Sequence, residues 1–162
     1  MIIKVNSKEQ LAGCLDIIHR SFITVADDFG LTKDNCPSHT AFMPLEKLEE
    51  QYADGRAMFL YEHGKTKVGY FSLKQSGNNT ELDNLAVLPA YRHLGIGREM
   101  IDFAKEYARE HLHTEKLTIG VIEENAVLKE WYKSLGFVHT ATKKIPHLPF
   151  TVGFMEIRFQ EI

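Results

Sequence analysis

Hydrophobic positions along the chain follow two spacings, one typical of strands and one typical of helices. Apolar runs of about four to eight residues between turn-forming residues indicate strands. Apolar residues three and four positions apart indicate helices with one buried face. The pattern predicts strands at 2–5, 57–61, 68–73, 81–87, 116–122, 137–142 and 153–159, helices at 7–22, 44–52, 95–111 and 126–135, and a long loop at 27–44. Strands and helices therefore alternate, which favours a layered α/β or mixed α+β fold.

Local signals support the ends of these elements. Ser7 and Gln10 form a capping-box pattern at the start of the first helix. Gly136 stands in a C-cap position after the last helix. Turn-forming clusters at 63–65 and 76–79 separate three successive strands, so these strands are expected to form an antiparallel meander. We find no internal repeat, low-complexity tract or linker, so a single domain over residues 1–162 is expected.

Composition and charge narrow the classes of function. The 19 Lys and Arg residues against 22 Asp and Glu give a net charge of -3, so the basic excess needed to bind nucleic acid through its phosphates is missing. No apolar stretch reaches the roughly 18 residues that span a membrane, and the N-terminus lacks a signal-peptide pattern. A cytoplasmic protein without a membrane partner is expected. Cys14 and Cys36 match no metal-ligand spacing, which predicts two reduced thiols and no bound metal.

The stretch from Glu81 to Gly97 carries the strongest chemical signal. It consists of a predicted strand, a loop beginning at Pro89, and a glycine-bearing turn that leads directly into a helix. A helix N-terminus has unpaired N–H groups and the positive end of the helix dipole, so it can bind an anion. Gly95 and Gly97 would let a phosphate approach these amides closely, and Arg92 adds a positive charge.

Other phosphate-binding motifs fit this stretch less well. A P-loop needs Gly-Lys-Ser/Thr, whereas Arg98 and Glu99 follow Gly97. A dinucleotide-binding fingerprint needs a third small residue at the position of Met100. Two glycines also simply ease a tight strand-to-helix turn, and short glycine motifs often occur by chance. On these residues alone, the phosphate site and the plain turn are equal alternatives.

Two motifs in the chain resemble signatures of one family, the GNAT superfamily of N-acetyltransferases. Residues 92–97, Arg-His-Leu-Gly-Ile-Gly, are similar to its Arg/Gln-x-x-Gly-x-Gly/Ala motif and follow a strand of the form apolar-x-x-Leu-x-Val-x-Pro. Residues 117–136 resemble its second signature, with Asn125 after a strand and Tyr132 shortly before Leu-Gly-Phe. The resemblance covers about 57–159, whereas the N-terminal part matches only in its helices. It implies an α/β fold with a mixed, mostly antiparallel seven-stranded central sheet, helices on both faces, and a splay at the cofactor strand.

The resemblance implies acetyl-CoA as the cosubstrate and assigns its contacts. The backbone of the cofactor strand would hold the pantetheine arm and the thioester. The amides of the following loop, with the Arg92 side chain, would hold the pyrophosphate. Asn125 would hydrogen-bond the pantetheine arm, although Asn is also a common helix N-cap and the two roles are compatible. The implied cofactor residues are Leu85, Ala86, Val87, Arg92, His93, Leu94, Gly95, Ile96, Gly97, Arg98 and Asn125.

The resemblance also implies that an acceptor amine attacks the thioester directly, with no covalent intermediate. Glu81 would take the amine proton through water, and Asp83, on the same strand face, is the reserve candidate. Tyr132 would protonate the departing CoA thiolate, and it lies seven residues after Asn125 on the same side of a helix. A backbone N–H near Val87 would polarise the thioester carbonyl. The alternatives are that Glu81 is a solvated strand-end residue and that Tyr132 is a core aromatic.

The acceptor pocket would lie between two loops, residues 21–42 and 143–153. The first loop combines carboxylates with aromatic side chains, which suits a protonated amine that has an apolar part. A solvated loop with hydrophobic anchors is the alternative. The candidate substrate contacts are Asp27, Asp28 and Phe29. The chain is therefore predicted to be an N-acetyltransferase acting on a primary amine of a small molecule or peptide.

Two other functions stay open at this point. Transfer of a longer acyl group from an acyl-CoA is compatible with the same motifs. A non-catalytic CoA-binding sensor or partner module on the same fold needs neither an acid nor a base, so Glu81 and Tyr132 argue against it. Many members of the family pair as dimers, so the resemblance leaves a homodimer open as well.

Overall fold

A seven-stranded mixed sheet forms the centre of the structure, a computed structural model that describes residues 1–159. Residues 160–162, the end of the predicted single domain, lie outside this description. The strands stand in the order β1-β2-β3-β4-β5-β7-β6, and every neighbouring pair is antiparallel except β4 and β5. In chain order the elements are β1 (Ile2–Lys4), the 3₁₀ turn η1 (Lys8–Gln10), α1 (Leu11–Asp28), η2 (Thr40–Phe42), α2 (Leu45–Ala53), β2 (Ala57–His63), β3 (Thr66–Ser76), β4 (Asn79–Val87), η3 (Pro89–Tyr91), α3 (Ile96–Glu110), β5 (Lys116–Ile122), α4 (Ala126–Ser134), β6 (Val138–Lys144) and β7 (Thr151–Arg158).

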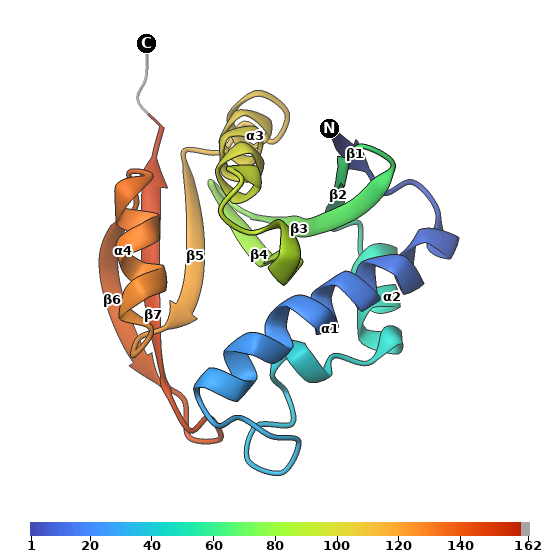
Figure 1. The fold of residues 1–162 in the computed structure, drawn as a ribbon. Coiled ribbons are helices and arrows are strands. Elements are labelled where there is room, and N and C mark those ends of the chain that lie inside the picture. Colours follow the sequence, from blue (N-terminus) through green and yellow to red (C-terminus); the bar gives the residue numbers. More distant parts are fainter. Residues whose placement is uncertain (160–162) are drawn as a thin grey trace.

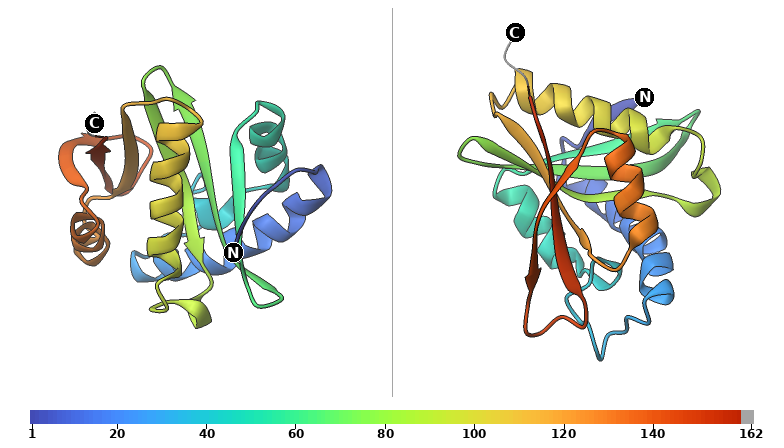
Figure 2. Two further views of the ribbon diagram at one scale, coloured as in Figure 1. Left: turned by 90° about the horizontal axis from the view of Figure 1, so that it is seen from above. Right: turned by 90° about the vertical axis from the view of Figure 1, so that its left-hand side faces the viewer.

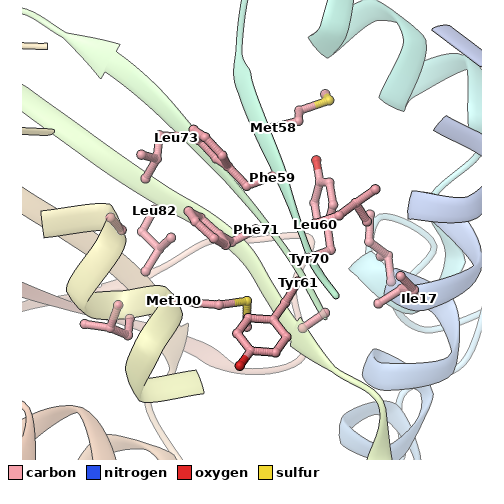
Figure 3. Packing of buried hydrophobic residues seen from close by; sticks show 14 of the residues in the cluster. Ile17, Met58, Phe59, Leu60, Tyr61, Tyr70, Phe71, Leu73, Leu82 and Met100 are labelled. Atoms are coloured by element: carbon pink, nitrogen blue, oxygen red, sulfur yellow. The ribbon is translucent and has the colours of Figure 1, made fainter. Parts of the chain in front are cut away.

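Helices cover both faces of this sheet (Figures 1 and 2). Side chains alternate along a strand, so neighbouring residues of β2 and β3 serve opposite faces. Figure 3 shows Phe59 and Phe71 pointing to the α3 side of the sheet, where Met100 lies, whereas Tyr70 points toward the α1 side, where Ile17 lies. All five of these side chains are buried. The sheet is therefore packed between α1 and α2 on one face and α3 on the other.

Aromatic side chains dominate the α3 side of the core. Phe59 and Phe71 stack with ring centroids 5.0 Å apart, and Phe103 of α3 meets Phe59 edge-on at 5.1 Å. Tyr107, one turn later on α3, contacts Phe59 in the same way. Truncating a buried Phe to Ala typically costs about 3–5 kcal/mol, so this cluster fixes α3 firmly on β2 and β3.

β4 and β5 pair only at their beginnings. Parallel pairing covers residues 79–81 of β4 and 116–118 of β5, and the strands then diverge. A β-bulge accompanies the divergence, because the pairing register of β3 and β4 shifts between Tyr70 and Ser72. Asn84 of β4 has a left-handed φ of 57°, a conformation that Asn tolerates better than most residues. We call the unpaired stretch, residues 82–87 of β4 and 119–122 of β5, the β4–β5 split.

The predicted elements and the seven-stranded, mostly antiparallel sheet are confirmed, with shifts at several ends. α1 continues to Asp28, past the predicted start of the loop, and the loop contains the short turn η2. β2 and β3 extend until His63 pairs with Thr66. Gly64 with φ 65° makes this tight hairpin feasible. Within residues 1–159, the helices are too short or too polar for any of them to cross a membrane.

Candidate active site

The β4–β5 split exposes backbone groups of β4 that have no strand partner. The Leu88 N–H donates to the Val68 carbonyl at 2.8 Å, and successive residues of an antiparallel strand bond in opposite directions. The N–H and carbonyl of Val87 therefore point away from β3, toward the split. Ala86 is buried and Leu85 is half-buried at the same place. The Val87 N–H therefore has no strand partner on the open side of β4, and its role in polarising a carbonyl oxygen stays a prediction.

The predicted glycine loop connects β4 to α3 through two left-handed residues. His93 has φ 65° and Gly95 has φ 83°, and α3 begins at the next residue. The first helical hydrogen bond runs from Glu99 N–H to the Gly95 carbonyl at 3.1 Å. The amides before Glu99 in this turn consequently have no intrahelical partner. Residues 93–95 are exposed, so an anion can approach this N-terminus from solvent.

Gly97 has a second reason to be a glycine. A Cβ placed on this residue would lie 3.1 Å from two carbon atoms of the Trp131 ring of α4. Contacts this short require the neighbouring group to move, and Trp131 is a large, half-buried side chain. The missing side chain therefore lets α4 approach the start of α3. Both expected cofactor-binding segments meet at this contact.

Arg92 does not point along the glycine loop. Its Nε donates to the Val87 carbonyl at 3.2 Å, and its Nη2 donates to the Ser21 carbonyl at 2.9 Å and to Thr24 Oγ1 at 3.1 Å. Burial lowers the pKa of Arg92 from its ordinary value, and the Asp28 carboxylate opposes this change. The guanidinium group thus joins α1 to the end of β4. Its expected contact with a pyrophosphate stays a prediction.

Glu81 lies where the parallel pairing ends. Its partners across the sheet are Lys74 of β3 and Thr118 of β5, and its side chain is half-buried. Its carboxylate makes no ion pair or side-chain hydrogen bond with residues 1–159. Asp83, on the same face of β4, accepts a 2.7 Å hydrogen bond from Arg56. This ion pair engages Asp83, which leaves Glu81 as the better base candidate.

Asn125 and Tyr132 occupy α4 as expected from their spacing. The Asn125 side chain accepts a hydrogen bond from the Leu128 N–H at 3.2 Å, so it caps the helix. Tyr132 is buried, with its ring edge-on to Trp131 at 4.9 Å and to Phe137 at 5.4 Å. Its hydroxyl makes no hydrogen bond with the described residues, and burial raises the pKa of Tyr132 above its ordinary value. The phenol therefore keeps its proton at neutral pH, as a general acid must.

A charged network that the sequence analysis did not find holds α4 in place. Glu123, just after β5, bonds Lys129 of α4 at 2.6 Å and His139 of β6 at 2.9 Å. These contacts lower the pKa of Glu123, with the Lys129 hydrogen bond contributing most. Gly153 of β7 lies directly beneath the carboxylate, where a Cβ would clash with it. The role of Glu123 could not be predicted from the sequence, because its partners lie on other elements.

The two loops expected at the acceptor side do meet. A second apolar cluster joins the α1–α2 loop to the β6–β7 loop at the end of β5, through Ile122, Leu148 and Phe150. Phe29 packs against this cluster, whereas Asp27 and Asp28 are exposed at the end of α1. The buried residues of the cluster are Ala26, Leu31, Cys36, Ala41 and Ile122, and the partly buried ones are Phe22, Val25, Phe29, Phe42, Leu148 and Phe150.

The same loop reaches the split itself. Thr40 Oγ1 of η2 donates to Asn84 Oδ1 in the bulge of β4 at 3.4 Å, and His39 meets Phe22 and Phe42 edge-on. Burial lowers the pKa of His39, which caps η2 through its Nδ1. In the part of the chain that the structure describes, no three His, Cys, Asp or Glu side chains are grouped as metal ligands.

Comparisons with known proteins agree with this geometry. The chain matches the acetyltransferase (GNAT) family over residues 24–137. An uncharacterized N-acetyltransferase in the pepI 3' region of Lactobacillus delbrueckii subsp. lactis is 29% identical over 128 residues, 70% of this chain and 72% of that protein. The ribosomal-protein-alanine N-acetyltransferase of Brucella melitensis superposes with a TM-score of 0.74 at 22% identity, over 98% of this chain and 99% of that one. The PaiA N-acetyltransferase of Thermoplasma acidophilum, in complex with coenzyme A, gives 0.75 at 17% identity over 98% and 99%. The chain belongs to the GNAT family of acetyltransferases.

Proposed function

We propose that this protein transfers an acetyl group from acetyl-CoA to a primary amine of a small molecule or peptide. The observation that carries the proposal is the combination of the β4–β5 split with the exposed N-terminus of α3, which follows β4 in the chain. The split offers unpaired strand groups to a thioester and its pantetheine arm. The N-terminus of α3 offers unpaired helix amides to a pyrophosphate. The family membership of the chain supports acetyl transfer.

The acyl donor would lie across three elements. The backbone of Leu85, Ala86 and Val87 would hold the pantetheine arm and the thioester. The amides of residues 93–98 would hold the pyrophosphate. Asn125, which already caps α4, would contact the arm through its side-chain amide group, because its Oδ1 is used by the Leu128 N–H.

In the proposed reaction the acceptor nitrogen attacks the thioester carbon, and the carbonyl oxygen becomes an oxyanion. The Val87 N–H would donate to this oxygen, since it points into the split. Glu81 would accept the proton that the amine loses, through water. When the C–S bond breaks, Tyr132 would give its proton to the sulfur of CoA. An ordinary alkyl amine has a pKa near 10, so it must lose a proton before or during attack.

The acceptor would enter on the side of the loops joined by the second apolar cluster. Half-buried Phe22 and Phe42 flank His39 there. Aromatic walls and an unpaired carboxylate at Glu81 suit an amine with an apolar body. Asp27 and Asp28, exposed at the end of α1, would attract a cation at longer range.

The test is release of free CoA thiol from acetyl-CoA with a panel of primary amines and amino-terminal peptides. We expect at least one amine to raise thiol release well above hydrolysis. Binding is followed separately through Trp131, the single tryptophan, which touches the glycine loop and should change its fluorescence when CoA binds. CoA binding without turnover on the whole panel would favour the non-catalytic sensor. A lack of any CoA binding would overturn the proposal.

A further inference from the structure

We propose that Arg92 is a positioning residue that fixes α1 to the end of β4, and that it is not a phosphate ligand. The inference rests on the proposed function in one respect, that the β4–β5 split binds the acyl donor. Within the glycine motif the first residue would be expected to face the anion. Its contacts lie elsewhere.

Three of the five N–H groups of the guanidinium are already used. Nε–H donates to the Val87 carbonyl, and the two hydrogens of Nη2 have the Ser21 carbonyl and Thr24 Oγ1 as acceptors. The Thr24 hydroxyl donates to the same Ser21 carbonyl at 2.8 Å, which leaves its lone pairs free to accept from Arg92. Among residues 1–159, Nη1 is the one guanidinium nitrogen without a hydrogen-bond partner, so it is free to meet a further anion.

The charges around Arg92 fit a link to α1. Ser21, Thr24 and Asp28 lie on one side of the last two turns of this helix, at spacings of three and four. The C-terminal end of a helix carries partial negative charge, and the last turn of α1 has no basic residue of its own. Arg92, which is about 70 residues away in sequence, places a positive charge near this end of α1. The Asp28 carboxylate further supports its charge.

The link joins the two sides of the proposed reaction. Val87 carries the N–H that points into the split, and Arg92 holds the carbonyl of the same residue. Phe22, next to Ser21, belongs to the aromatic group at the acceptor side. Arg92 therefore sets the position of the acceptor wall relative to the thioester. A phosphate ligand at this position would affect only the affinity for the donor.

The two roles predict different kinetics for Arg92→Gln, measured with the best amine of the panel. A positioning role predicts that the acceptor KM rises and kcat falls, about tenfold together, even at saturating acetyl-CoA. A phosphate ligand predicts a higher KM for acetyl-CoA alone. Thr24→Val removes one bond of the link at nearly constant shape and should reproduce part of the effect, whereas Thr24→Ser, which keeps the hydroxyl, should restore it.

A second readout needs no acceptor. Amide hydrogen exchange at residues 21–28 and at Leu88, whose N–H donates to the Val68 carbonyl, should quicken in Arg92→Gln, while its affinity for CoA changes less than about threefold. Unchanged exchange together with a tenfold or greater loss of CoA affinity would overturn the proposal. If Arg92→Gln does not fold, Thr24→Val carries the same two measurements. Failure of the proposed function is distinguishable, because the wild-type protein would then bind no CoA or release no thiol with any amine of the panel.

Discussion

Glu81 and Tyr132 come from different elements, β4 and α4, and have different environments. Glu81 is half-buried, and its carboxylate makes no ion pair or hydrogen bond among residues 1–159. Tyr132 is buried among aromatic rings and keeps its proton. An unpaired carboxylate and a phenol that keeps its proton suit the two proton transfers of an aminolysis.

Replacing Glu81 tests the base. We expect Glu81→Gln to lower kcat/KM for the acceptor by about 10²-fold at neutral pH, because the amide cannot accept the amine proton. The affinity for CoA, followed through Trp131, should stay unchanged. Glu115→Gln is the matched control, since this exposed carboxylate lies just before β5 and outside the split. Equal activity of the two variants in the thiol-release assay would remove Glu81 from the mechanism.

Replacing Tyr132 tests the acid without disturbing the core. Tyr132→Phe removes a hydroxyl that has no hydrogen-bond partner among the described residues, so the free energy of unfolding should change by less than about 1 kcal/mol. We expect kcat to fall at least tenfold, since the CoA thiolate would then leave without a proton donor. Stopped-flow single-turnover kinetics isolate the chemical step. Full turnover in that experiment would assign Tyr132 to the core alone.

At the scale of elements, α4 depends on the charged network around Glu123. The pKa of Glu123 is lower in the folded state than in the unfolded state, where it is near 4.3. The network therefore stabilises the fold fully above pH values near the unfolded pKa. This stabilisation is lost as the pH falls through the folded pKa. We expect Glu123→Gln to lower the Tm at pH 7. The difference from wild type should shrink as the pH falls below about 4. A Tm difference that is constant with pH would contradict this role.

A side chain added at Gly153 tests the same network, because it would crowd the Glu123 carboxylate. A methyl group on Gly153 would overlap the Glu123 carboxylate and push it away from Lys129 and His139, so Gly153→Ala should lower the midpoint of unfolding. Gly120→Ala is the matched control, because its Cβ would make only ordinary contacts, 3.7 Å or longer, with Val152 and Phe154. Both variants are compared by urea unfolding. Equal midpoints would mean that the carboxylate moves aside without cost.

Local patterns predicted the elements and the glycine loop, because backbone conformation there depends on nearby residues. The left-handed Gly95 and the N-cap Asn125 are examples. The direction of the Arg92 side chain had no such signal, because its partners on α1 lie 71 and 68 residues away in sequence. The bulge at Asn84 and the Glu123 network also depend on contacts between distant elements. Family resemblance supplied candidate roles, whereas the contacts decide which groups are free to perform them.

At the scale of the whole molecule, the donor would contact three elements at once. The proposed contacts come from β4, the start of α3, and α4. Helices α3 and α4 approach each other where the Trp131 ring lies against Gly97. A ligand held by all three elements binds only the folded chain, so it must raise the stability of the entire fold.

Thermal unfolding with acetyl-CoA therefore measures the site as a whole. At 100 times its Kd, a ligand adds about 2.7 kcal/mol to the free energy of unfolding, which corresponds to a Tm increase of roughly 5–10 °C for a domain of this size.

Leu94 is 58% exposed in the glycine loop, so it can be changed without disturbing the core. Leu94→Asp places a carboxylate beside the amides, and Leu94→Asn is its uncharged match. If the amides bind the pyrophosphate, the Asp variant should show about half the Tm increase of the Asn variant at the same concentration, because a tenfold loss of affinity removes about 1.4 kcal/mol. Equal Tm increases in the two variants would place the phosphates elsewhere.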